Sequence, residues 1–275
     1  MLPQGGPTPV IIAHISDSHL ARQGTTFAGE AELARSVDHL LRLPARPDVV
    51  LLTGDLTDNG HPAEYARVRE LLAPLPMPVY AVPGNHDNRE AFLEAFGTPG
   101  EHPLAGFSQY VVEADPLRLI ALDTVIPGSG AGELDAERLE WLEARLAEAP
   151  GRPTLLFMHH PPFELGLLVS DSLALQHQDA FAALVARHPQ VEAVVAGHVH
   201  ATLVRRFAGT LALSAGSTRA QWLYDLGQPG RLAVRMEPPS CLLHVWNART
   251  GLLTHSSLIG QDDPTTLLHD GERWL

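Results

Sequence analysis

The chain has 275 residues, enough for one large domain or two small ones, and an apolar fraction of 45% that is ordinary for a globular protein. Its formal charge of −13 argues against a long nucleic-acid partner, because proteins that bind polyanions need a basic face. The single cysteine excludes an intrachain disulfide, and no apolar run approaches the ~20 residues needed to cross a bilayer.

The first two hundred residues alternate predicted strands and helices, as expected for an α/β fold. Short apolar runs predict buried strands at 10–15, 49–53, 78–82, 107–112, 117–122, 154–158 and 191–196. Apolar residues such as Leu33, Val37 and Leu40 recur with the spacing of one helix face. Helices are predicted on this basis at 30–43, 62–73, 89–96, 134–147 and, for the most part, 172–187.

After residue 200 the pattern changes to short strands joined by turn residues, at 203–207, 210–214, 241–246 and 252–258. These strands predict an antiparallel sheet of meanders. The stretch 216–240 mixes Gly, Pro and aromatic residues without a clean period, and we interpret it as a long loop. We therefore expect one α/β domain over residues 1–260, with two sheets and helices outside, followed by a polar tail over residues 261–275.

Side chains that can bind a metal follow five of the predicted strands, each within four residues of the strand's end. They lie in the segments Asp17-Ser18-His19, Gly54-Asp55, Gly84-Asn85-His86, His159-His160 and Gly197-His198-Val199-His200. In open α/β sheets the loops at the carboxyl ends of the strands converge, and sites form there. Asp17 and His19 are two residues apart, so we expect them to project from one side of extended backbone. The sequence predicts one cluster made of Asp17, His19, Asp55, Asn85, His159, His198 and His200.

Mixed imidazole and carboxylate ligands suit Mn, Fe, Zn or Co better than calcium or a thiolate-loving metal. We expect two such ions per chain, divalent or trivalent. Two dications, less the charges of Asp17, Asp55 and a bridging hydroxide, leave about +1 in the pocket, which attracts a singly charged phosphodiester. Nine other histidines, among them His14 and His244, show no ligand spacing and are expected at the surface or hydrogen-bonded in the interior.

These five segments, in this order, resemble the calcineurin-like metallophosphoesterase superfamily from residue 10 to about residue 200. The resemblance implies a four-layer α-β-β-α sandwich, in which two mixed sheets pack face to face with helices outside. It also implies two ligand sets that share Asp55: Asp17, His19, Asp55 and His200 for one metal, and Asp55, Asn85, His159 and His198 for the other. In the pair His159-His160 the family's ligand matches His159, at the strand end two residues before a proline.

Two residues carry the expected chemistry, His86 and Asp55. We expect in-line attack on phosphorus by a metal-bound hydroxide, with Asp55 bridging the metals. His86 follows a ligand without being one, and we expect it to protonate the departing alkoxide or to stabilise its charge. The alternative for His86 is a hydrogen bond to a ligand.

Departures from the family pattern narrow the choice among the branches of the superfamily. Asn59 stands where the Ser/Thr protein phosphatases carry a phosphate-binding arginine, and Asp58 stands where the purple acid phosphatases carry a tyrosine. The segments 54–60, 84–89, 159–162 and 197–200 are similar to those of the class III cyclic nucleotide phosphodiesterases and the bacterial glycerophosphodiesterases. This resemblance implies a small phosphodiester substrate, with a 3′,5′-cyclic nucleotide as first choice and a glycerophosphodiester or broad specificity as the alternative.

The substrate pocket and the partners are predicted less sharply. An aromatic ring near the metals could stack on a base or simply pack, and the candidates are His61, His160, Phe163, Trp222 and Tyr224. A competing class of function is a scaffold with this fold and no chemistry, but such proteins typically lose ligands that are present here. The first eight residues do not resemble a signal peptide. We therefore expect a cytoplasmic enzyme without a membrane or nucleic-acid partner, and a homo-oligomer stays open.

Overall fold

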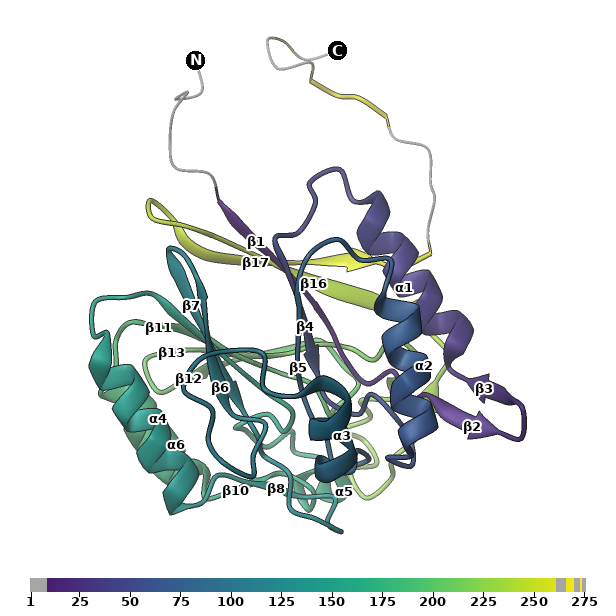
Figure 1. Cartoon of the computed structure of the whole chain (residues 1–275), viewed down its shortest axis with the longest axis horizontal. Coiled ribbons are helices and arrows are strands. Elements are labelled where there is room, and N and C mark those ends of the chain that lie inside the picture. Colours follow the sequence, from purple (N-terminus) through teal and green to yellow (C-terminus); the bar gives the residue numbers. More distant parts are fainter. Residues whose placement is uncertain (1–8, 261–265, 270–272, 274–275) are drawn as a thin grey trace.

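Two mixed sheets face each other at the centre of the computed structural model, which describes residues 9–260, 266–269 and 273 (Figure 1). Most of the predicted tail lies outside the described residues, so a domain boundary at residue 260 stays a prediction. Within the described part of the chain, no helix combines the length and the apolar character that crossing a membrane requires.

The first sheet has five strands in the order β17-β16-β1-β4-β5. β1, β4 and β5 are parallel, and β16 and β17 continue the sheet in antiparallel pairing. In chain order its strands are β1 Val10–Ile15, β4 Val49–Thr53, β5 Val79–Val82, β16 Ser240–Asn247 and β17 Gly251–Leu258. Three helices pack their apolar residues against its outer face: α1 Glu30–Arg42, α2 Pro62–Leu72 and α3 Arg89–Phe96.

The second sheet has six strands in the order β12-β13-β11-β9-β7-β6, in which the four inner strands are parallel and the two edges antiparallel. In chain order they are β6 Tyr110–Ala114, β7 Leu117–Leu122, β9 Thr154–Met158, β11 Val191–Ala196, β12 Leu203–Phe207 and β13 Thr210–Ser214. Its outer face is covered by α4 Ala136–Glu148 and α6 Gln178–Ala186. A third apolar core lies between the two sheets, so the predicted four-layer sandwich is confirmed.

The predicted antiparallel sheet of C-terminal meanders is wrong, because its strands are divided between the two sheets. β12 and β13 extend the second sheet, where β13 runs parallel to β11. β16 and β17 extend the first sheet beside β1. The cause is long-range pairing, since β1 and β11 each present an edge that a later strand completes.

The helix predicted at 172–187 is also wrong in part. The chain forms α5 Leu168–Asp171, then β10 Leu175–Gln176, and only then α6. β10 pairs with β8 Gly132–Glu133, and this tertiary pairing overrides the local helical pattern. Small hairpins fill two stretches with no predicted element: β2 Ala21–Gln23 with β3 Thr26–Ala28, and β14 Gln221–Trp222 with β15 Val234–Arg235 inside the predicted loop.

Candidate metal centre

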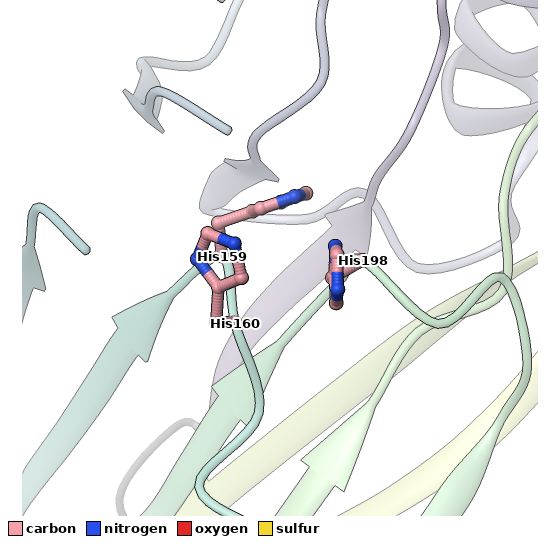
Figure 2. A group of neighbouring side chains, drawn as sticks. All are labelled: His159, His160 and His198. Atoms are coloured by element: carbon pink, nitrogen blue, oxygen red, sulfur yellow. The ribbon is translucent and has the colours of Figure 1, made fainter. Parts of the chain in front are cut away.

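The seven predicted ligands follow the carboxyl ends of five strands, three in the first sheet and two in the second. β9 and β11 bring His159 and His198 to the seam between the sheets (Figure 2). Asp55, after β4, lies opposite them. Its Oδ2 is 3.5 Å from His159 Nε2 and 3.6 Å from His19 Nε2. The Asp55 carboxylate therefore stands between the two halves of the cluster.

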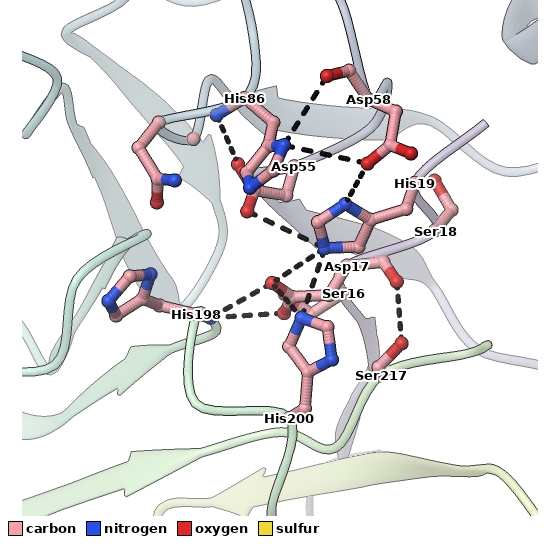
Figure 3. A network of polar contacts seen from close by, with 12 residues as sticks. Ser16, Asp17, Ser18, His19, Asp55, Asp58, His86, His198, His200 and Ser217 are labelled. Atoms are coloured by element: carbon pink, nitrogen blue, oxygen red, sulfur yellow. Dashed lines mark hydrogen bonds and ion pairs between the residues drawn. The ribbon is translucent and has the colours of Figure 1, made fainter. Parts of the chain in front are cut away.

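The first half consists of Asp17, His19 and His200 (Figure 3). The Nε2 atoms of His19 and His200 face each other at 3.0 Å, and Asp17 Oδ1 lies 3.4 Å from His200 Nε2. His200 donates its Nδ1 proton to the carbonyl oxygen of Ala220 at 2.8 Å, because a carbonyl can only accept. His19 Nδ1 binds Asp58 Oδ1 at 2.8 Å. Both rings thus turn Nε2 inward, the arrangement that oxygen partners impose on metal-binding histidines.

The second half consists of Asn85, His159 and His198. His159 donates Nδ1–H to the Thr53 carbonyl oxygen at 2.7 Å, and its Nε2 lies 3.1 Å from Asn85 Oδ1. Among the described residues, His198 Nε2 is buried without any hydrogen-bond partner. Burial lowers the His198 pKa to about 3, so this ring is neutral and offers a lone pair. A buried ring nitrogen left unpaired is costly, and a metal ion bound to it would satisfy it.

His160 also has a ring nitrogen close to those of His159 and His198 (Figure 2). Both of its nitrogens, however, have hydrogen-bond partners outside the cluster. Nδ1 binds Thr124 Oγ1 at 2.8 Å and Nε2 binds the Gly130 carbonyl oxygen at 3.2 Å. The ring is fully buried, and its role in lining the substrate pocket stays a prediction. Its hydrogen bonds favour His159 over His160 as the ligand.

The backbone of the ligands departs from the extended geometry expected for Asp17 and His19. Five of the seven adopt positive φ: Asp17 at 55°, His19 at 43°, Asp55 at 47°, His198 at 71° and His200 at 44°. Such backbone costs a non-glycine residue about 1–3 kcal/mol, and it persists where the surrounding structure enforces it, typically at functional sites. The side chains of Asp17 and His19 approach each other because the backbone turns sharply after β1. They do not point the same way by the side-chain alternation of an extended strand.

His86 lies at the rim of the cluster (Figure 3). Its side chain is 43% exposed, its backbone N–H donates to Asp55 Oδ1 at 2.8 Å, and its Nδ1 lies 3.3 Å from the Asp58 carbonyl oxygen. Asp58 thus contacts both His19 and His86. Arg219 donates to the His19 carbonyl oxygen at 2.7 Å and lies 3.8 Å from Asp58 Oδ2. Neither residue was predicted as functional; Asp58 belongs to the quoted 54–60 segment, whereas no sequence signal marks Arg219.

Four other residues were predicted to shape the pocket. Phe163 is 4% exposed and packs in the core under α4 and α6, and its part in the substrate pocket stays a prediction. His61 is the N-cap of α2 and accepts from the Ala63 backbone N–H. Tyr224 is 43% exposed and donates its hydroxyl to the Leu165 carbonyl oxygen. Trp222 stacks on the His200 ring with centroids 5.5 Å apart, which places an indole beside the cluster.

The electrostatics of the cluster favour cations. Burial opposes ionisation of Asp55, but His159 and His19 outweigh it and hold the Asp55 pKa well below its usual value. Burial likewise opposes protonation of His159, yet the Asp55 carboxylate raises the His159 pKa to about 9. A metal ion that binds His159 Nε2 would displace the proton that Asp55 holds there. Ionised carboxylates, inward imidazole Nε2 atoms and an amide oxygen are then donors that Mn, Fe, Zn or Co accept. The residues present therefore fit a pair of such metals.

Comparison with known proteins agrees with this geometry. The family model described as calcineurin-like phosphoesterase matches residues 10–202. A probable glycerophosphodiester phosphodiesterase GpdQ of Arcobacter nitrofigilis is 35% identical over 257 residues, covering 92% of this chain and 94% of the relative. The 3′,5′-cyclic adenosine monophosphate phosphodiesterase CpdA of Pseudomonas aeruginosa is 32% identical over 217 residues, or 78% of each chain. A dimetal phosphatase from Danio rerio shares the fold, with a TM-score of 0.65, 16% identity, and coverage of 89% of this chain and 98% of that one.

Proposed function

We propose that this chain hydrolyses small phosphodiesters at two transition metals held around Asp55. The chain belongs to the calcineurin-like phosphoesterase family, which supports this proposal. One observation carries the proposal: Asp55 Oδ2 lies almost equally far from His19 Nε2 and His159 Nε2, at 3.6 and 3.5 Å. A carboxylate between two imidazoles of separate ligand groups is placed to be shared by two ions.

The proposed ligands divide around that carboxylate. Asp17, His19 and His200 would hold one ion with Asp55, and Asn85, His159 and His198 would hold the other. When bound, a metal pair lowers the pKa of a water molecule that attacks phosphorus and offsets charge on the phosphoryl oxygens. The metals proposed are Mn, Fe, Zn or Co.

His86 would act on the leaving group. Its exposed ring stands beside the cluster, and Asp58 faces its Nδ1 from 3.3 Å through a carbonyl oxygen. With Nδ1 donating to that oxygen, protonation of Nε2 gives an acid directed away from Asp58. Such an imidazolium can protonate the alkoxide oxygen as it leaves phosphorus.

Two side chains that could bind the second charge of a monoester have partners elsewhere, which favours a diester. Asn59, at the position of the protein phosphatase arginine, donates its amide to Glu64 Oε1 at 3.0 Å. The guanidinium of Arg89 is paired with Asp123, with contacts of 2.8 and 3.0 Å. Neither side chain is placed to bind the second negative charge of a monoester. A bidentate arginine typically provides that interaction.

For the substrate, we propose a 3′,5′-cyclic nucleotide first and a glycerophosphodiester second. The indole of Trp222 beside His200 supports the first, since a base can stack on an aromatic ring. The name of the relative from Arcobacter nitrofigilis supports the second. The cytoplasm, absence of a membrane or nucleic-acid partner, and an open oligomeric state stay predictions.

The experiment compares hydrolysis of bis-p-nitrophenyl phosphate with that of p-nitrophenyl phosphate by the manganese-loaded protein. We expect the diester to be cleaved about tenfold faster or more, because the monoester misses a charge-assisted hydrogen bond of about 1.5 kcal/mol. Asp55→Ala should lose both metal and activity, whereas Asp38→Ala, which removes an exposed carboxylate on α1, should lose neither. A strong preference for the monoester would contradict the diesterase, and a metal-loaded protein inert to both esters would favour a scaffold.

A further inference from the structure

A line of buried polar side chains crosses the first sheet and ends against the metal centre without belonging to it. It starts at the half-buried Thr254 on β17 and passes through His244 on β16 and His14 on β1. It then reaches Thr53 at the end of β4 and Ser16 after β1. Both histidines are fully buried, as are Thr53 and Ser16. Polar groups in such a position must satisfy one another.

The line is continuous. Thr254 Oγ1 lies 2.8 Å from His244 Nδ1, and His244 Nε2 lies 3.2 Å from His14 Nδ1. His14 Nε2 lies 2.7 Å from Thr53 Oγ1, which is 2.7 Å from Ser16 Oγ. Ser16 Oγ finally donates to the Thr53 carbonyl oxygen at 3.2 Å. Every ring nitrogen and hydroxyl in the line has a partner.

The carbonyl at its end sets the direction of each bond. A carbonyl only accepts, so Ser16 donates to Thr53 O, and the Thr53 hydroxyl must then donate to Ser16. Thr53 Oγ1 consequently accepts from His14 Nε2–H, and His14 Nδ1 accepts from His244 Nε2–H. His244 Nδ1 accepts from Thr254. Both imidazoles therefore carry their single proton on Nε2.

Neutral rings fit the surroundings. Burial lowers the pKa of His14 well below its usual value, and the neighbouring His244 lowers it further. Burial also lowers the His244 pKa to about 3. The line thus places no charge in the sheet, and each ring donates once and accepts once.

Its inner end is where both sheets meet. The Thr53 carbonyl oxygen, which closes the line, also accepts the Nδ1 proton of His159 at 2.7 Å. Ser16 Oγ fills the space beside Gly197, where an added Cβ would lie only 2.0 Å away. The ends of β1, β4, β9 and β11 are packed together at this point. A carbonyl cannot pass a proton onward, so the line is not a proton path, and its effect on the site is one of orientation.

We propose that His14 and His244 are positioning residues, which hold Thr53 so that its carbonyl fixes the His159 ring with Nε2 toward the metal. The inference rests on the proposed function, in which His159 is a ligand. It assigns to two histidines without ligand spacing a role in metal affinity, exerted through three strands of the first sheet.

The test replaces His244 with leucine in the full-length protein and measures Mn²⁺ affinity by equilibrium dialysis. His244→Leu removes the donor to His14, and we expect manganese to bind about tenfold more weakly or worse, as when the oxygen partner of a ligand is lost. His188→Leu is the control, because it removes a mostly buried imidazole that binds Glu143 at 3.0 Å outside the line. His244→Gln, whose amide can both donate and accept, should recover part of the affinity. Equal affinities in His244→Leu, His188→Leu and the wild type would overturn the proposal.

A second measurement covers the case in which His244→Leu fails to fold. Thr53→Val keeps the side-chain shape and removes only the hydroxyl, and we expect the same loss of affinity. In ¹⁵N-histidine NMR spectra of the zinc-loaded wild type, His14 and His244 should both be neutral with the proton on Nε2, and His159 should carry it on Nδ1. A proton on Nδ1 of either His14 or His244 would refute the line of bonds. A wild type that binds no metal would refute the proposed function. The tautomers of His14 and His244 would still show whether the line of hydrogen bonds from Thr254 to Thr53 exists.

Discussion

Oxygen atoms from distant parts of the chain orient the imidazoles of the cluster. Asp58 Oδ1 forms a hydrogen bond with Nδ1 of His19, the Ala220 carbonyl oxygen with Nδ1 of His200, and the Thr53 carbonyl oxygen with Nδ1 of His159. In each ring the hydrogen bond occupies Nδ1, so Nε2 faces the centre of the cluster. His86 differs, because its side chain is 43% exposed and its contact with the Asp58 carbonyl is longer, at 3.3 Å. This looser contact and the exposed position are why we propose that His86 moves a proton and does not hold a metal.

Replacing His86 with alanine should separate these roles. We expect His86→Ala to retain both metals and to lose about 10²–10⁴-fold in turnover of a diester with a poor leaving group, the usual contribution of acid catalysis. The loss should shrink when the leaving group is p-nitrophenolate, which needs little protonation. Metal content and the two rates measure this. Loss of metal, or an equal loss of rate for both esters, would contradict the acid role.

Glycines at the turns after the strands let the ligand loops approach one another. An added Cβ on Gly84, after β5, would lie 2.2 Å from Asp55 Oδ1 and 2.7 Å from His159 Cε1. On Gly54, after β4, it would lie 2.4 Å from His159 Nδ1. The absence of a side chain at these two turns is thus a condition for Asp55 and His159 to meet.

Gly84→Ala tests the turn. The new methyl group must displace the Asp55 carboxylate or its backbone, so we expect metal affinity and diester turnover to fall by at least about 10²-fold, since small misplacements of reacting groups are that costly. Gly151→Ala is the matched control, because nothing lies within 4 Å of the added Cβ. Manganese dialysis and turnover of both variants provide the measurement. Wild-type affinity in Gly84→Ala would show that the loops are not packed this closely.

The residue ranges of individual helices and strands could be predicted from the sequence far better than the pairing of the strands into sheets. The strands β1, β4, β7, β9 and β11 and the helix α3 begin and end at the predicted residues. Short apolar runs are local signals, and so is Gly97, which ends α3. The sheet that β16 or β13 would join depends on which edge is free, and no local pattern encodes that. For the same reason the sequence indicated the ligand candidates at the strand ends but not the positive φ of Asp17, nor the oxygen that orients each ring.

At the scale of the molecule, neither sheet contains the cluster alone. The first sheet contributes Asp17, His19, Asp55 and Asn85, and the second contributes His159, His198 and His200. The family match ends at residue 202. Beyond it, Ala220 and Arg219 contact His200 and His19, and β16 pairs with β1. A chain with a formal charge of −13 can still attract an anionic ester here, because two cations bound at the proposed ligands would dominate the local field.

The central claim, that side chains from both sheets hold two ions around Asp55, is tested most directly by anomalous scattering from a crystal grown with manganese. We predict two anomalous peaks on either side of the Asp55 carboxylate, roughly 3.5–4 Å apart as in other two-metal sites. One peak should contact His19 and His200, and the other His159 and His198. A single peak, or manganese bound at His160 with none beside Asp55, would contradict the account.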